Sequence, residues 1–471
     1  MSSIESGVST SHRSLLQRLL ATFRIASPLK KELAFLTIPI FIETLLIMSL
    51  GAMDTFMLSR YSDAAVAAVG LANQIVTFCF IVFEVINLGT SVLCSQYLGA
   101  RLHRRLELVV GVSLAINFLF GIIISSTLYF FPTRILSAMG LEGEMLPLGV
   151  SYMRIVGALA FVQALAMTLS AVLRSTNKAY WPMLVVLVVN ILNIFGNYAL
   201  IFGKFGMPAL GVTGAAITTA SCRTLSMIVL FIIVFTTTIH RFPWTIFRHW
   251  PREEFRSLMK VGLPSAGEQL SYSCSQLVIA FFITSLGMEA LAVRTYCVNL
   301  IMYSYLFCIA ISHGGAIVVG HLVGASKWNG AYILGKYVCK VGTIITFSFS
   351  ILLAIAGPTI FHWLSDNPEI VALGIAVLWI DVPLEIGRPI NIVFVNILQG
   401  SGDVNFPFYV AVVFMWSIAV GLAYVFGIVL GYGILGMWWM FCLDECVRGG
   451  VFIYRWRSKR WMHRAFVPHA A

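Results

Sequence analysis

Long apolar stretches separated by short polar connections run through the whole sequence and determine the elements that we expect. A helix needs about 20 mostly apolar residues to cross a bilayer. Twelve stretches reach that length, at roughly 33–58, 65–98, 107–131, 146–172, 181–202, 210–238, 259–286, 290–323, 333–357, 369–398, 405–428 and 432–454. The pattern predicts an all-α integral membrane protein of about twelve transmembrane helices, several of them tilted or extended beyond the bilayer.

The second half of the chain repeats the pattern of the first. Pro264 follows Pro39 by 225 positions, and Glu268 follows Glu43 by the same offset. The offset also holds for Ala67 and Ala292, Gly99 and Gly324, Leu173 and Leu398, Pro182 and Pro407, Leu210 and Leu435, and Arg223 and Arg448. Each half contains six spans, so both halves enter the membrane from the same side. We expect two pseudo-symmetric six-helix halves with a substrate cavity between them.

Composition places the chain in lipid and excludes several classes of protein. Hydrophobic residues make up 59% of the 471 residues and charged residues 11%, whereas soluble domains carry about 25% charged residues. The net charge of +11 is spread over short runs between apolar stretches, which favours membrane topology over a nucleic-acid partner. The nine cysteines are scattered without metal-ligand spacing, so we expect small buried side chains and no metal cluster.

Basic residues gather in every second connection, which predicts the orientation of the bundle. They include Arg101, Arg104, Arg105, Arg174, Lys178, Arg241, Arg248, Arg252, Arg256 and Lys327. The positive-inside rule then places both termini in the cytoplasm of a multi-pass protein, which we interpret as residing in a bacterial inner membrane. We expect a cytoplasmic tail at 1–32, an N-terminal half at 33–240, a cytoplasmic linker at 241–258, a C-terminal half at 259–455 and a basic cytoplasmic tail at 456–471.

Polar residues within the spans carry the candidate chemistry, because the usual catalytic motifs are missing and we expect no enzyme. Asp54 lies late in the first span, where a carboxylate either takes up a proton, holds a cation or sits in water at the headgroup level. Asn190, Asn193 and Asn197 share one face of the fifth span. They predict either a hydrated cation site or hydrogen bonds between helices.

A second set of polar residues lies in the C-terminal half. Asp381, Glu385 and Arg388 share a face of the tenth span, and Glu385 is spaced to pair with Arg388. Glu268 lies one turn after Pro264, where it either takes part in proton coupling or contacts backbone freed by the proline. Further polar residues are Glu84 in the second span, the Asp444–Arg448 pair in the last span, and Arg223; we interpret both arginines as members of structural ion pairs.

Several stretches resemble the multidrug and toxic compound extrusion (MATE) transporters across residues 33–455. They are Thr37-Ile-Pro-Ile with Met53-Asp-Thr, the stretch from Asn193 to Gly206, Leu210-Gly-Val-Thr-Gly-Ala-Ala-Ile-Thr-Thr, Val261-Gly-Leu-Pro and Ile397-Leu-Gln-Gly-Ser-Gly-Asp. The resemblance implies a monomeric exporter that exchanges a small organic compound, cationic or amphipathic, for H⁺ or Na⁺ and needs no other cofactor. It also implies that a cavity between the halves opens alternately to each side of the membrane.

The resemblance also assigns roles to individual residues. It implies a coupling-ion site at Asp54, Asn193, Asn197 and Thr219, with Na⁺ at Asp54 as one alternative. It implies a C-terminal cavity containing Glu268, Asp381, Glu385 and Arg388. Many relatives carry aspartate where this chain has Asn197, which favours H⁺ over Na⁺ because one carboxylate suffices for one proton.

Two other classes of transporter remain as alternatives. A major-facilitator transporter would also have two six-helix halves, but the basic loop after Gly99 lacks the aspartate of that family's motif. A lipid-linked saccharide flippase would need a strongly cationic cavity, whereas carboxylates outnumber arginines within these spans. A membrane receptor would not explain the repeat.

Overall fold

A computed structural model describes residues 27–239 and 250–467 of the chain. Three segments lie outside the described part: residues 1–26 of the predicted tail at 1–32, residues 240–249 with the first part of the predicted linker at 241–258, and residues 468–471. Arg241 and Arg248 lie in the second of these segments. Within the described part the secondary structure consists of helices joined by short turns, with no strand.

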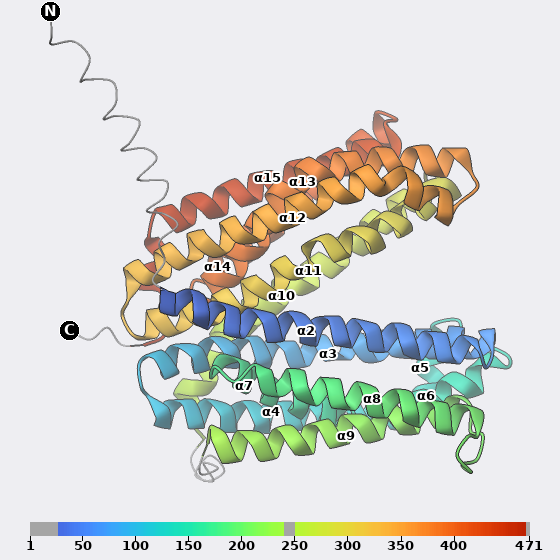
Figure 1. The fold of residues 1–471 in the computed structure, drawn as a ribbon, viewed down its shortest axis with the longest axis horizontal. Coiled ribbons are helices and arrows are strands. Elements are labelled where there is room, and N and C mark those ends of the chain that lie inside the picture. Colours follow the sequence, from blue (N-terminus) through green and yellow to red (C-terminus); the bar gives the residue numbers. More distant parts are fainter. Residues whose placement is uncertain (1–26, 240–249, 468–471) are drawn as a thin grey trace, which may run out of the picture.

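The N-terminal half forms one bundle of helices (Figure 1). In chain order they are α2 (Ser27–Ser59), α3 (Asp63–Gly99), α4 (His103–Phe130), α5 (Pro132–Ala138), α6 (Met145–Ala158), α7 (Ala160–Ser175), α8 (Tyr180–Phe202) and α9 (Val212–Thr237). Helices α6 and α7 meet at an angle of 48° and together make one broken span.

The C-terminal half forms a second bundle. Its helices are α10 (Arg252–Thr284), α11 (Met288–Gly324), α12 (Trp328–Leu364), α13 (Pro368–Ser401), α14 (Asn405–Phe414) and α15 (Gly433–Arg457). Two π-helical segments, η2 (Met415–Leu422) and η3 (Val425–Val429), continue the line of α14, and a short 3-10 helix, η4 (Arg460–His463), follows α15.

These helices make twelve spans, six in each bundle. Among the described residues, nine helical stretches are long and apolar enough to cross a membrane, and the bent pair α6–α7 makes a tenth. Helices α10 and α15 complete the set, although polar and charged residues along them lower their hydropathy. The molecule is therefore the all-α, multi-pass membrane protein that the apolar pattern predicts.

The helix boundaries repeat at the predicted offset of 225 positions. Helices α10 and α11 begin and end 225 residues after α2 and α3, respectively. Two turns repeat as well. Arg101 and Ser326 both have positive φ, as do Asn177 and Gly402. These backbone features follow one register from α2 to the turn after α13. The predicted alignment of the two halves is therefore confirmed.

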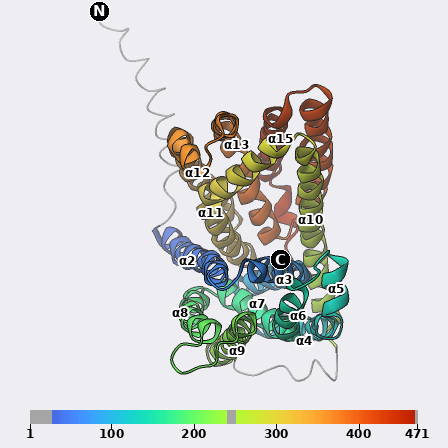
Figure 2. The ribbon, with the colours of Figure 1, turned by 90° about the vertical axis from the view of Figure 1, so that its right-hand side faces the viewer.

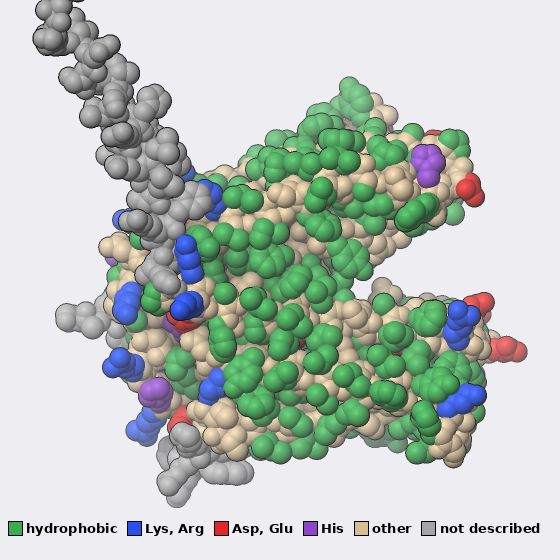
Figure 3. Space-filling model, viewed as in Figure 1, with side chains coloured by type: hydrophobic (Ala, Val, Ile, Leu, Met, Phe, Trp, Pro, Cys, Tyr) green, Lys and Arg blue, Asp and Glu red, His purple; other side chains and the backbone are tan. Residues whose placement is uncertain are grey.

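The two bundles meet at one end and separate toward the other, which gives the molecule a V shape (Figure 1). Seen along the long axis, the C-terminal bundle lies above the N-terminal bundle (Figure 2). A deep cleft opens between them at the end opposite to most of the lysines and arginines, and hydrophobic side chains cover the outer surface (Figure 3). At the closed end, α3 crosses α11 at two glycines. A Cβ on Gly99 would lie 2.1 Å from the carbonyl oxygen of His321, and a Cβ on Gly324 would lie 2.0 Å from that of Gln96.

Two predicted boundaries differ from the observed ones. Helix α10 begins at Arg252, so the second part of the predicted linker belongs to the first helix of the C-terminal bundle. The predicted C-terminal tail also packs on the protein. Trp461 is completely buried and stacks on Trp456 with 4.1 Å between ring centroids. The backbone N–H of Phe466 donates to Oε1 of Gln96 at 2.9 Å, so this segment contacts both bundles.

Candidate coupling and substrate sites

Asp54 is joined directly to the asparagines of α8. Nδ2 of Asn197 donates to Oδ1 of Asp54 at 2.7 Å and to Oδ1 of Asn193 at 2.8 Å. Both asparagines are buried, whereas Asp54 is partly accessible near the end of α2. Three of the four residues predicted for the coupling site therefore form one hydrogen-bonded group within the N-terminal bundle.

Thr219, the fourth predicted residue, contacts a neighbouring tyrosine instead. Its side chain lies beside Tyr152 of α6, whose hydroxyl donates to Oδ1 of Asn73 at 3.0 Å. No hydrogen bond joins Thr219 to Asp54 in the described part of the chain. The third asparagine of the α8 face, Asn190, donates to the carbonyl oxygen of Leu46 at 2.6 Å, which supports the interhelical role for this residue.

Arg223 of α9 is an unexpected member of this region. Its guanidinium lies over the ring of Phe80, 5.5 Å from the centroid, and interacts electrostatically with Asp54 and Tyr152. The predicted structural ion pair for Arg223 is wrong, since no carboxylate in the described ranges pairs with it. Its Nη1 is buried without a hydrogen-bond partner. The region therefore contains one carboxylate and one guanidinium that are not in contact.

The orientation of the amides bears on which ion the Asp54 region would hold. Na⁺ is bound by oxygen atoms, but Asn197 presents its amino group to Asp54. The Oδ1 atom of Asn197 is buried without a partner and does not complete a shell with the carboxylate. In this orientation the Asn197 amide donates to Asp54 and does not offer its oxygen to a cation shared with the carboxylate.

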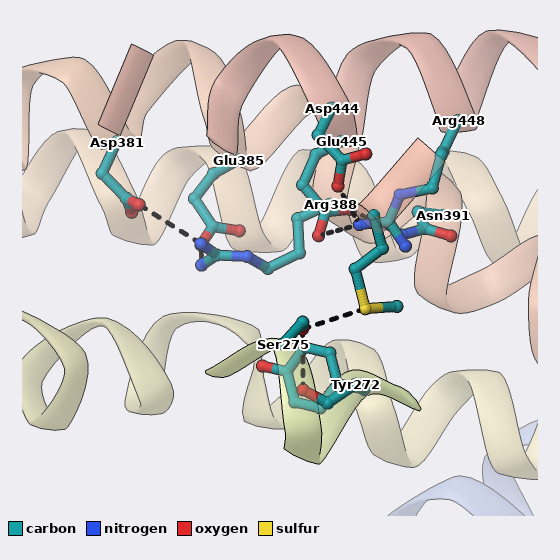
Figure 4. Close-up of polar contacts among 10 residues, drawn as sticks. Tyr272, Ser275, Asp381, Glu385, Arg388, Asn391, Asp444, Glu445 and Arg448 are labelled. Atoms are coloured by element: carbon teal, nitrogen blue, oxygen red, sulfur yellow. Dashed lines mark hydrogen bonds and ion pairs between the residues drawn. The ribbon is translucent and has the colours of Figure 1, made fainter. Parts of the chain in front are cut away.

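The three predicted residues of α13 form a single ionic cluster (Figure 4). Arg388 pairs with Glu385, as the spacing predicts, and also with Asp381 at 3.4 Å. Both carboxylates are buried, and Nε1 of Trp438 donates to Oδ1 of Asp381 at 3.4 Å. One guanidinium therefore serves two carboxylates in the interior of the C-terminal bundle.

A second arginine, on α15, repeats this arrangement (Figure 4). Arg448 pairs with Asp444 at 2.5 Å, as predicted, and with Glu445 at 2.8 Å. Nδ2 of Asn391 donates to Oε2 of Glu445 at 2.6 Å and connects this cluster to α13. Glu445 was not among the predicted site residues, although its spacing of three residues from Arg448 indicates a pair.

Glu268 and its repeat mate Glu43 occupy different environments. Glu43 is buried and pairs with Arg174 of α7 at 3.1 Å, which supports a structural role. Glu268 instead accepts a hydrogen bond from Nε2 of Gln399 at 3.0 Å and interacts electrostatically with Arg448 without an ion pair. Spacing along the chain could not predict Gln399 as a partner, because it lies 131 positions away.

The interior of the C-terminal bundle thus contains more carboxylates than cations. Two guanidiniums, those of Arg388 and Arg448, face five carboxylates on α10, α13 and α15: Glu268, Asp381, Glu385, Asp444 and Glu445. Asp381, Glu385 and Asp444 are buried, whereas Glu268 and Glu445 are partly accessible, so a proton or a bound cation would lower the cost of the excess negative charge. This excess makes the C-terminal bundle a second candidate for ion coupling and cation binding.

Comparison with known proteins identifies relatives along almost the whole chain. The profile of the MatE family matches residues 39–199 and again 264–425. An uncharacterized transporter of Bacillus subtilis, YisQ, is 39% identical and covers 91% of this chain and 94% of its own. A probable multidrug resistance protein NorM of Thermotoga maritima is 27% identical over 93% of this chain and 94% of its own length.

Solved structures show the same fold. A MATE protein in the bent conformation superposes with a TM-score of 0.82 at 22% identity, covering 92% of this chain and 95% of that one. The Vibrio cholerae MATE transporter VcmN in its bent form gives a TM-score of 0.84 at 17% identity, and the match covers 92% of this chain and 97% of VcmN. With two matches of the family profile in the register of the internal repeat, and relatives of similar length, this chain belongs to the MatE family of multidrug and toxic compound extrusion transporters.

Proposed function

We propose that this protein is a secondary active antiporter that exports small organic compounds, cationic or amphipathic, in exchange for H⁺. The cleft between the two bundles carries the proposal, because it opens at one end only and has acidic groups in the interiors of both walls. The named relatives that are probable multidrug resistance proteins support the class of substrate.

Competition for carboxylates explains how exchange would work. A carboxylate accessible from the cleft binds a coupling ion or a cationic substrate, but not both well at once. Transport then requires that one bundle rocks against the other and exposes the site to the opposite side. Each ligand drives this change only through its different affinity for the two states.

We assign the coupling step to Asp54, which is hydrogen-bonded to Asn197 and through it to Asn193. Thr219 would contribute indirectly, because it contacts Tyr152 and not Asp54. The amino group that Asn197 presents to Asp54 favours H⁺ over Na⁺. The acidic excess around Glu268, Asp381, Glu385 and Arg388 supports a share in coupling or cation binding for the C-terminal cavity.

The proposed setting is a bacterial inner membrane, with a monomer whose termini both lie in the cytoplasm. Lysines and arginines gather at the closed end of the molecule, where α2 begins and α15 ends (Figure 3). The positive-inside rule places that end in the cytoplasm, so the described state is open to the outside. The 1–32 and 456–471 segments then belong to the cytoplasmic side.

Efflux from proteoliposomes, with H⁺ and Na⁺ gradients imposed separately, tests the proposal. We expect export of an organic cation such as ethidium to follow an inward H⁺ gradient and to stop when a protonophore collapses it. Transport driven by Na⁺ alone would move the assignment to the other coupling ion. Transport of a lipid-linked saccharide without either gradient would favour the flippase alternative.

A further inference from the structure

A small pocket lies where the two bundles begin to separate. Helices α3 and α10 cross closely there. A Cβ on Gly262 would lie 2.3 Å from the carbonyl oxygen of Val85, and one on Gly89 would lie 2.9 Å from that of Leu258. Just beyond the crossing, toward the open end, a pocket of about 230 Å³ is lined by residues that include Phe80, Ile81, Glu84, Met167, Ala266 and Gln269.

Glu84 supplies the charge in this otherwise largely apolar pocket. Its Oε2 accepts one long hydrogen bond, from Nδ2 of Asn87 at 3.4 Å. No lysine or arginine forms an ion pair with it in the described ranges 27–239 and 250–467. Asn87 is itself held in the bundle core, where its Oδ1 accepts from Asn117 at 3.1 Å and from Thr168 at 3.0 Å. Asn87 therefore holds the Glu84 carboxylate in place, and no basic side chain of the described ranges neutralises its charge.

We propose that this pocket binds the cationic head group of an amphipathic organic substrate. The carboxylate supplies the opposite charge, Phe80 and Ile81 supply apolar contact, and the thioether of Met167 adapts to varied shapes. An apolar wall with a single convergent charge is the usual character of a small-molecule site. The pocket fits a head group, and the apolar part of the substrate would extend outside it.

The position of the pocket links its occupancy to the conformational change. Phe80, Glu84 and Met167 belong to the N-terminal bundle, whereas Ala266 and Gln269 belong to α10 of the C-terminal bundle. Rocking of the bundles changes the distance between these walls, so the affinity for a cation differs between the two states. Phe80 also contacts Arg223, which connects the pocket to the Asp54 region.

This inference rests on the proposed export of organic compounds, but equilibrium binding tests it without any gradient. Ethidium binding is measured by fluorescence on the purified full-length protein in nanodiscs. Glu84→Gln removes the charge and keeps the shape, and we expect Kd to rise about tenfold or more, since one partly shielded charge pair is worth at least that factor. Ala266→Leu fills the pocket and keeps the charge, and it should weaken ethidium binding as well.

Glu142→Gln, on the exposed loop after α5, is the matched control and should leave Kd unchanged. The neutral dye N-phenylnaphthylamine distinguishes charge recognition from general damage, and Glu84→Gln should not weaken its binding. The inference is overturned if wild-type protein does not bind ethidium, if Glu84→Gln and Ala266→Leu both bind it as wild type does, or if Glu84→Gln weakens both dyes equally. If Glu84→Gln does not fold, the inference is tested by Ala266→Leu alone, and ethidium binding as in the wild type would overturn it.

Failure of the proposed function would look different. In that case wild-type protein would bind ethidium with the expected dependence on Glu84 and yet export nothing under either ion gradient.

Discussion

The hydrogen bond between Asp54 and Asn197 is the contact on which the coupling proposal depends. A carboxylate that faces an amide N–H₂ group is stabilised without a second negative charge nearby. An aspartate at position 197 would instead place two carboxylates side by side, where they would share a proton or bind a cation. The proposed preference for H⁺ over Na⁺ therefore depends on the single negative charge that Asn197 leaves to Asp54.

Asp54→Asn should abolish gradient-driven export and leave the protein folded. The change keeps the shape of the side chain, removes its charge, and still allows a hydrogen bond with Asn197. Uptake and efflux in proteoliposomes under an imposed H⁺ gradient measure the effect, and gel filtration reports folding. Wild-type rates from this variant would move the coupling step to Glu268 or Glu385.

Arg388→Ala should lower the yield of folded protein strongly, because it leaves Asp381 and Glu385 buried without a counter-ion. Breaking such a pair costs about 3–5 kcal/mol. Adding Glu385→Gln should restore part of the yield, and adding Asp381→Asn as well should restore more. The yield of monodisperse protein extracted from membranes is the measurement, and equal yields for all three variants would contradict the shared pairing.

The site residues were predictable only where their partners lie close in sequence. Spacing predicted the contacts of Glu385 with Arg388 and of Asp444 with Arg448, since one helical turn brings such residues together. The contacts of Asp54 with Asn197 and of Glu268 with Gln399 join residues 143 and 131 positions apart. Helix packing decides which faces meet, and spacing within one helix carries no information about that. For the same reason, spacing could not show that Arg223 lacks the predicted ion pair within the described ranges.

At the scale of helices, glycines determine how closely the two bundles approach. The carbonyl oxygens of His321 and Gln96 lie where the Cβ atoms of Gly99 and Gly324 would be. These two glycines are repeat mates, so the crossing of α3 with α11 is itself pseudo-symmetric. Only residues without a side chain allow the backbones this close contact.

Gly324→Ala should destabilise the closed end, because overpacking in a tight interface costs about 1–3 kcal/mol and the neighbouring atoms here are backbone. Thermal unfolding in detergent measures the loss as a lower Tm. Gly70→Ala is the matched control on α3, since nothing lies within 4 Å of a Cβ at that position. A similar Tm for the two variants would contradict the close crossing as a source of stability.

Most helices could be predicted from the lengths of the apolar stretches, because a lipid-exposed segment must satisfy its backbone hydrogen bonds internally. The break between α6 and α7 could not. It falls at Leu159 within an apolar stretch, without a proline or a charge to mark it. The start of α10 was also missed, because its first turns are polar and extend beyond the apolar segment that hydropathy detects.

At the scale of the whole molecule, a few polar contacts between the bundles accompany the glycine crossings at the closed end. His321 of α11 contacts Glu32 of α2 at 3.2 Å, and its Nε2 lies 2.8 Å from the carbonyl oxygen of Ser175. Nε2 of Gln96 donates to the carbonyl oxygen of Gly400 at 2.9 Å. Since the cleft separates the other end, these contacts favour the described state over one that opens at the basic end.

Gln96→Leu should shift the population toward the opposite state, because it removes the hydrogen bonds to Gly400 and Phe466. Spin labels at Glu142→Cys and Asp366→Cys, on exposed loops of the two bundles at the open end, report the distance across the cleft. The background carries serine at the exposed positions Cys274 and Cys446. We expect a larger fraction of short distances than in labelled protein with Gln96 intact. An unchanged distribution would show that the polar contacts do not set the balance between states.

The acidic excess of the C-terminal bundle has a consequence for the energetics of export across a charged membrane. If a monovalent cation leaves while two protons enter, each cycle carries one net positive charge inward. The membrane potential then contributes about 2.3 kcal/mol per 100 mV, which corresponds to about a fiftyfold steeper concentration ratio of the exported compound. The five clustered carboxylates exceed Arg388 and Arg448 by three, which gives this cluster the capacity for such an electrogenic cycle. A strictly one-for-one exchange of cations would draw no work from the potential.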